Sequence, residues 1–130
     1  MIQIGEEKMK NVVVFGGGTG LSHILKGLKL FPVNVTAIIS VSDNGSSTGI
    51  LKKELNIPAI GDIGTVMTSM ANTNEDVKKL LKYRFKNGSL ENHAVKNFLL
   101  AAMYDIKGNL TDAVEVLCNL LDIKGTILPI

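Results

Sequence analysis

The sequence predicts an α/β fold: a Rossmann-like parallel sheet with a βαβ start and a helix-rich second half. Residues 11–15 form an apolar, β-branched run without alternation, which is typical of a strand buried on both faces of a parallel sheet. A glycine-rich turn at 16–20 follows at once, and apolar residues then recur at helical spacing until Pro32. A second β-branched run at 33–41 completes the βαβ unit.

The helix between these strands is predicted from four apolar residues at i, i+3, i+4 and i+7, which should form one buried stripe. They are Leu21, Ile24, Leu25 and Leu28. After the second strand, residues 42–48 are polar and rich in turn formers, so a loop is expected there. A short helix is expected at 49–55, before Pro58.

Almost everything after Gly61 is predicted to be helical. Thr73 or Asn74 is a candidate N-cap for a helix whose apolar residues run from Val77 to Phe85. Residues 92–104 are apolar nearly all round, which predicts a central, buried helix. Residues 110–121 carry the clearest amphipathic stripe, and 125–130 resemble the beginning of a strand.

The length of 130 residues allows one domain, assigned to 11–130 after a leader at 1–10. Few strands accompany the predicted helices, and two strands rarely suffice for a doubly wound sheet. Either the helices make most of the fold, or the rest of the sheet is missing and the chain is truncated.

The charge balance argues against nucleic acid as a partner. Fourteen basic and 12 acidic residues give a net charge of +2, and Arg84 is the only arginine. Cys118 lies in an apolar helical stripe, where a buried thiol is expected instead of a nucleophile. The N-terminus lacks the apolar run of a signal peptide, and no run of about 20 apolar residues predicts a membrane span. We therefore expect a cytoplasmic protein.

The glycine-rich turn is the first candidate site, because a parallel strand passes into a helix there. Backbone amides at Gly17, Gly18, Thr19 and Gly20 would face the phosphates of a ligand at the helix N-terminus. The spacing is not the dinucleotide fingerprint, whose third glycine would fall on Leu21, and no Walker lysine follows. A purely structural tight turn remains the alternative.

Polar residues after the second strand form another candidate site, close to the glycine turn in a standard βαβ unit. A carboxylate there can accept hydrogen bonds from ribose or hold a hydrated Mg²⁺; an ordinary Asx turn is the alternative. The residues are Asp43, Asn44, Ser46 and Ser47.

Two residues further along the chain are also candidates. Asp62 follows Gly61 and either lines the ligand cleft or caps the next helix. His93 is either a polar cleft residue or a structural histidine. His23 falls on the polar face of its helix and is expected at the surface.

Ordered motifs spread over residues 12–129 resemble the bacterial gluconeogenesis-factor family of YvcK type, relatives of the 2-phospho-L-lactate transferase CofD. Members of that family are more than twice as long, so the chain resembles their N-terminal portion. The matching segments are 13–22, 28–29, 31–33, 36–38, 42–43, 45–47, 53–55, 61–62, 83–85, 93, 97 and 127–129.

The resemblance implies a Rossmann-like cytoplasmic regulator that binds a UDP-sugar such as UDP-GlcNAc, linked to gluconeogenic growth, cell-wall synthesis and cell shape. Its glycine turn would face the phosphates, and Asp43 with its following serines, Asp62, His93 and Asn97 would line the cleft. In the CofD branch, the same fold transfers a phospholactyl group from a nucleotide diphosphate with Mg²⁺. A fragment without ligand function, which self-associates or needs a chain that supplies the missing half, is the third possibility.

The sequence departs from the family pattern at charged positions. Ile50 and Gly64 stand where the family usually has arginines, and Thr65 stands where it has asparagine. The family's Gly-His-Ser-Leu-Gly-Asn appears here as residues 92–97, with Lys96 at the second glycine. The loss of two guanidinium groups near phosphates would weaken binding some hundredfold to ten-thousandfold unless Lys52 and Lys53 substitute.

Overall fold

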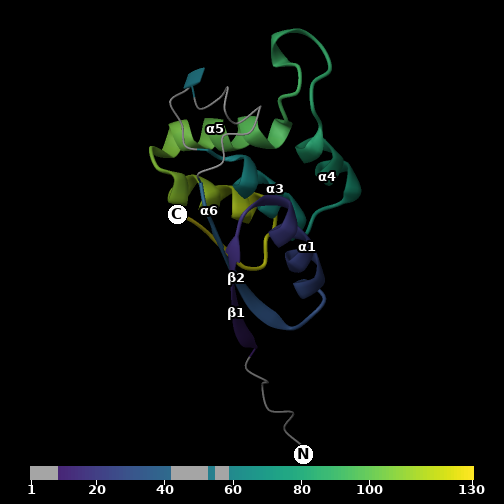
Figure 1. Cartoon of the computed structure of the whole chain (residues 1–130), viewed down its shortest axis with the longest axis vertical. Coiled ribbons are helices and arrows are strands. Elements are labelled where there is room, and N and C mark those ends of the chain that lie inside the picture. Colours follow the sequence, from purple (N-terminus) through teal and green to yellow (C-terminus); the bar gives the residue numbers. More distant parts are fainter. Residues whose placement is uncertain (1–8, 42–52, 55–58) are drawn as a thin grey trace, which may run out of the picture.

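The computed structural model describes residues 9–41, 53–54 and 59–130. In these residues, three parallel strands form one sheet in the order β1-β2-β3, accompanied by five α-helices (Figure 1). The α/β class predicted from the sequence is confirmed. The elements are β1 (Lys10–Gly16), α1 (Gly18–Leu28), β2 (Val33–Ile39), α3 (Gly61–Met70), α4 (Glu75–Lys82), the 3-10 turn η1 (Gly88–Leu90), α5 (Val95–Lys107), α6 (Leu110–Leu120) and β3 (Thr126–Pro129).

The predicted βαβ unit is present, and the last predicted strand joins it. β1 pairs with β2 from Lys10 opposite Val33 to Gly16 opposite Ile39. β3 lies on the other side of β2, with Thr36 opposite Thr126. The strand begins at Lys10, so the last residue of the predicted leader belongs to the sheet, whereas residues 1–8 lie outside the described residues.

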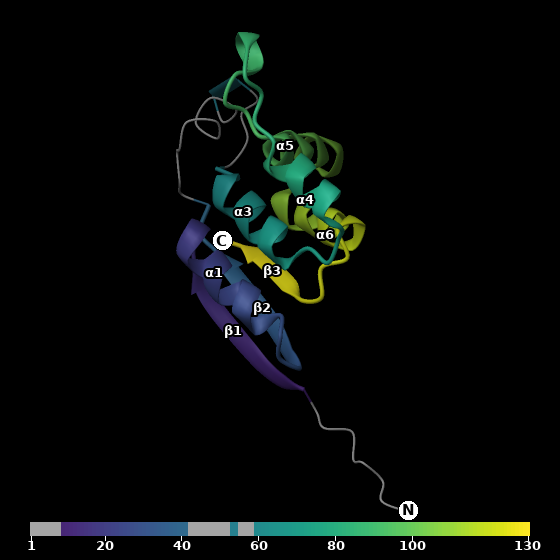
Figure 2. The same cartoon turned by 90° about the vertical axis from the view of Figure 1, so that its right-hand side faces the viewer.

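The core lies on one face of the sheet, because alternate residues of β2 point into it. Val35, Ala37 and Ile39 are buried there together with Leu25 of α1. α1 packs against α3, and α6 packs against β3, so the helices enclose this face (Figure 2). The sequence prediction that Ile24 shares the buried stripe was wrong: its side chain is 57% exposed, because α1 buries only a narrow stripe.

The opposite face of the sheet is open along β1. Phe15 pairs with Ile38, which pairs with Leu128, so these three side chains form one row across the sheet. Phe15 is 71% exposed and Val13 is 53% exposed. The prediction that β1 is buried on both faces is therefore wrong for the described residues, in which the helices cover only the other face.

The helical second half follows the prediction with shifted boundaries. The Asn74 side chain accepts a hydrogen bond from the Val77 amide and caps α4, as one of the two predicted caps. α4 ends at Lys82, so Phe85 lies beyond it, in the segment that forms an antiparallel bridge through Arg84. α5 begins at Val95, not at 92, and the predicted segment is not buried all round, because Ala102 is exposed.

Two further sequence predictions concern helices. Of the short helix expected at 49–55, Lys53 and Glu54 are helical and the other residues lie outside the described residues. Among the helices that the structure describes, none has both the length and the apolar character needed to cross a bilayer.

Candidate functional site

The N-cap residue of α1 is a glycine, which has no side chain to cap the first amides of the helix. Gly17 occupies the N-cap position in an extended conformation, and it makes no side-chain capping bond. The first turn of α1 contains no acidic residue. Gly18 has φ of 51°, a left-handed conformation that favours glycine. The N-terminus of α1 carries the positive end of the helix dipole, which suits an anion.

Asp62 lies directly against this turn. A Cβ atom added to Gly17 would stand 2.6 Å from Asp62 Oδ2, and one added to Gly18 would stand 2.7 Å from Oδ1. Such distances leave no space for a side chain at either position, so the two glycines permit the close approach of a carboxylate. Asp62 is in the first turn of α3, whose N-cap is Ile60; the alternative in which Asp62 is the N-cap is wrong.

A lysine that the sequence reasoning did not select lies at the same site. Lys96 is in the first turn of α5, and its Nζ donates a hydrogen bond of 2.9 Å to Thr65 Oγ1. Thr65 Oγ1 in turn donates to the Gly61 carbonyl at 3.1 Å, beside Asp62. In the sequence, Lys96 stood out only because the family pattern has a glycine there. That difference did not show which part of the fold the lysine would contact.

The electrostatic surroundings of Lys96 are predominantly positive. Burial lowers the pKa of the Lys96 ammonium, and the neighbouring charges of Arg84 and Lys82 lower it further. Asp62 acts in the opposite direction and raises this pKa, so the carboxylate lies within electrostatic reach. Among the described residues, the charges that act on this partly buried ammonium are more positive than negative.

Of the remaining predicted residues, the structure brings Asn97 to the site more clearly than His93. Asn97 is buried, and its Oδ1 lies 3.4 Å from where a Cβ at Gly64 would be, next to Lys96. His93 is also buried, and its ring lies 5.4 Å from that of Phe98 in a tilted arrangement. This contact favours the structural interpretation of His93. His23 is exposed, as expected.

The predicted loop site cannot be placed, because Asp43, Asn44, Ser46 and Ser47 lie outside the described residues. Within the described part of the chain, no cluster of three or more His, Cys, Asp or Glu side chains suitable for a metal is present. Mg²⁺ is commonly held by one or two carboxylates together with substrate phosphates and water. Asp62 beside the glycine turn fits the carboxylate part of that donor set, although one carboxylate alone would not hold the ion.

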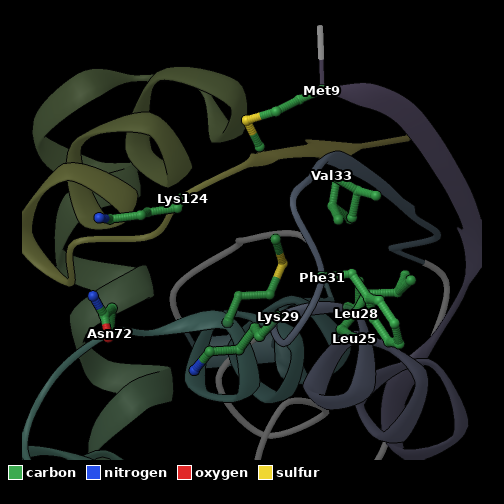
Figure 3. A pocket seen from close by; sticks show the side chains of 10 residues that line it. Met9, Leu25, Leu28, Lys29, Phe31, Val33, Asn72 and Lys124 are labelled. Atoms are coloured by element: carbon green, nitrogen blue, oxygen red, sulfur yellow. The ribbon is translucent and has the colours of Figure 1, made fainter. Parts of the chain in front are cut away.

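A separate cavity of about 220 Å³ lies at the opposite, amino end of the strands (Figure 3). Its lining includes Leu25, Val33 and Met70, and Lys29 lies at its edge. The Lys29 ammonium donates to the Ala71 carbonyl at 3.0 Å and so caps the C-terminal end of α3. Ligands of parallel α/β folds bind at the carboxyl ends of the strands, so we do not place the site in this cavity.

Cys118 is buried, as the sequence predicted. Burial raises the pKa of its thiol to about 11, and Glu115 contributes to the shift. A thiol that remains protonated at neutral pH is a poor nucleophile, which fits a core position on α6.

Comparison with known proteins gives the family. Residues 12–130 match the family described as 2-phospho-L-lactate transferase CofD. The chain belongs to the CofD family. The match covers all the described strands and helices except the first two residues of β1.

Relatives within this family include proteins named gluconeogenesis factor. The chain is 46% identical over 123 residues to the gluconeogenesis factor of Halalkalibacterium halodurans and 43% identical over 119 residues to that of Bacillus subtilis. It covers 94% and 91% of its own length in these matches and spans about 38% of each relative, as their N-terminal portion.

A solved structure supports the CofD-family fold. The crystal structure of a UPF0052-family protein from Bacillus halodurans superposes with a TM-score of 0.92 at 45% identity. The superposition covers 94% of this chain and 39% of that protein.

Proposed function

We propose that this chain is a nucleotide-sugar-binding, regulatory member of the CofD family. One observation carries the proposal: the glycine turn and the Asp62 carboxylate meet at the start of α1 and α3. The amides of Gly17, Gly18, Thr19 and Gly20 suit the diphosphate of a UDP-sugar such as UDP-GlcNAc. In this proposal, Asn97 contributes a buried amide to the lining of the site, and the buried His93 packs beneath the same lining.

The loop residues complete the proposed site. We assign Asp43, Asn44, Ser46 and Ser47 to the ribose or sugar side of the ligand, because the carboxyl end of β2 lies next to that of β1. The proposed single domain extends over 11–130. The relatives' name supports a role in gluconeogenic growth, and we extend it to cell-wall synthesis and cell shape in the cytoplasm.

Mg²⁺ is the proposed accessory ion. A diphosphate that approaches Gly17 and Gly18 meets the negative charge of Asp62, which repels it. A divalent cation between the carboxylate and the phosphates would turn that repulsion into attraction. When bound, the ion would supply charge neutralisation, while the glycine amides orient the phosphate oxygens.

Thermal unfolding of the 130-residue chain tests the proposal. The chain is heated alone and with UDP-GlcNAc, other UDP-sugars, ADP-sugars and Mg²⁺. A ligand at 100 times its Kd adds about 2.7 kcal/mol to the free energy of unfolding, a clear shift for a domain of this size. A cooperative transition raised selectively by a UDP-sugar supports the proposal, and a transition indifferent to every nucleotide contradicts it.

A Mg²⁺-dependent phospholactyl transferase is the second candidate, favoured by the family's description and by the carboxylate at the turn. Its test is transfer from a nucleotide-diphosphate donor to a deazaflavin acceptor in the presence of Mg²⁺. Binding of a UDP-sugar without any such transfer favours the regulatory function.

The open face of the sheet supports a further proposal about partners. The row Phe15, Ile38 and Leu128 is apolar, and the chain spans about 38% of its relatives. We propose that this face is covered by self-association, or by a polypeptide equivalent to the remaining portion of the relatives. Absence of ligand binding in a self-associated chain would indicate a fragment without ligand function.

A further inference from the structure

The Lys96 side chain packs against Gly64, in the space that a side chain at position 64 would need. A Cβ atom at Gly64 would lie 3.2 Å from Lys96 Cδ and 3.4 Å from Leu100 Cδ1. The aliphatic part of Lys96 therefore lies over the backbone of α3 at Gly64, in the space where a side chain at that position would begin. Glycine at 64 gives the lysine stem this place one turn from the N-terminus of α3.

The ammonium at the end of this stem reaches the site. Its hydrogen bond to Thr65 Oγ1 holds it at the first turn of α3, and Asp62 stands three residues before Thr65 on that turn. An ammonium has three N–H donors, and the structure shows one of them bound to Thr65. No described carboxylate lies within ion-pair distance of Lys96, since the ion pair found in the described residues joins Lys78 and Glu75.

The resemblance described above implies a matching exchange of residue types. Gly64 stands where the resemblance places an arginine, and Lys96 stands where it places a glycine. In the folded chain these two positions are in contact across α3 and α5. Lys96 thus brings a cation from α5 to the first turn of α3.

We propose that Lys96 is the phosphate-binding cation of the site, supplied from α5 in place of an arginine on α3. The inference rests on the proposed function, because it names the group that binds the diphosphate. The expected ligand is a nucleoside diphosphate derivative whose phosphates lie between the glycine turn and the Lys96 ammonium. Gly64 is then a positioning residue, since it acts only by leaving space for the lysine.

A purely structural role for Lys96 makes a different prediction. If the ammonium mainly stabilised α3 through Thr65, its removal would destabilise the free chain. A partly buried cation among Arg84 and Lys82 is instead held at an electrostatic disadvantage until an anion arrives. Removal of that charge should leave the free chain as stable as before, or more stable.

Isothermal titration with UDP-GlcNAc, UDP and inorganic pyrophosphate tests the proposal on the parent chain and on Lys96→Gln. Lys107→Gln is the matched control, because it removes the same charge from an exposed position on the same helix. We expect Lys96→Gln to weaken binding about tenfold to a hundredfold. Lys107→Gln should change the affinity less than twofold, and neither variant should lose its cooperative unfolding transition.

The proposed equivalence of positions 64 and 96 is tested by placing the cation on α3 instead of α5. Gly64→Arg alone should clash with Lys96 and lower both Tm and affinity. Combined with Lys96→Gly, it should recover a Tm and a Kd close to those of the parent chain. Failure of the double variant to recover more than the sum of the single variants would overturn the proposed equivalence of the two positions.

The outcomes separate this inference from the proposed function. Unchanged affinity in a folded Lys96→Gln variant would overturn the inference and leave UDP-sugar binding intact. Pyrophosphate binding that depends on Lys96, without any response to UDP-sugars, would support the inference and contradict the proposed function. A loss of Tm in Lys96→Gln without loss of affinity would show the structural role and overturn the inference.

Discussion

The carboxylate of Asp62 blocks the space beside Gly18: a Cβ atom added to Gly18 would lie 2.7 Å from Asp62 Oδ1. The contact joins the first turn of α3 to the first turn of α1, and Gly18 also has a positive φ of 51°. We therefore expect Gly18→Ala to lower the free energy of unfolding by about 1–3 kcal/mol. Urea denaturation followed by circular dichroism measures the change.

Gly20→Ala is the control for that substitution, because nothing lies within 4 Å of a Cβ at Gly20 and the residue is inside α1. Alanine is the better helix former, so the stability should be unchanged or raised by up to about 1 kcal/mol. Equal destabilisation by both substitutions would show that the approach of Asp62 is not the cause.

Asp62→Asn should make the affinity for a nucleotide largely independent of Mg²⁺. The amide retains the shape of the side chain and removes the charge that repels a diphosphate. We expect the parent chain to bind UDP-GlcNAc at least tenfold more tightly with Mg²⁺ than without it, and the variant to respond less than threefold. Titrations with and without EDTA make the comparison, with Asp105→Asn on the exposed side of α5 as the charge control. An equal Mg²⁺ response in parent and variant would exclude Asp62 as the ion's partner.

The lowered pKa of Lys96 predicts that a rise in pH has opposite effects on the affinity for an anionic ligand and on the stability of the free chain. Binding of an anion needs the protonated ammonium, so affinity should fall as pH rises through the lowered pKa. In the free chain, the unfolded state holds this proton up to about pH 10.5, whereas the folded state releases it earlier. The unfolded state then binds more protons, so this group's contribution to stability increases as pH rises.

The measurement for Lys96 is a ¹³C-detected titration of its ε-methylene group, with and without pyrophosphate. Burial lowers the pKa of Lys96 most, Arg84 and Lys82 lower it further, and Asp62 raises it. Asp62→Asn should therefore lower this pKa still more. A bound anion should shift it upward. An unshifted titration in both states would contradict the assigned burial of the ammonium.

Phe15→Lys should weaken self-association, because it places a charge at the β1 end of the apolar row with Ile38 and Leu128. Leu30→Lys is the matched control, since Leu30 is also exposed and apolar but lies in the turn after α1. Sedimentation velocity at several concentrations should show dissociation of Phe15→Lys alone. A monomeric parent chain, or equal effects of both substitutions, would contradict self-association through the sheet face.

The predictions from sequence succeeded where local chemistry dominates. The glycine turn at 16–20, the termination of the helix before Pro32 and the Asn74 cap depend on residues close together in the chain. They failed where burial depends on distant elements. The pattern of 11–15 describes a strand covered on both sides, yet in the described residues only the helix side is covered.

The sequence by itself determined that a glycine-rich turn joins the first strand to the first helix, because glycine spacing is a local property. Only the tertiary structure decided that Asp62 reaches this turn and that Lys96 fills the space above Gly64. Positions 18 and 62 are brought together by the packing of α1 on α3, and positions 64 and 96 by contact between α3 and α5. Such contacts depend on how side chains of separate helices fit against one another, which residue spacing along the chain does not specify.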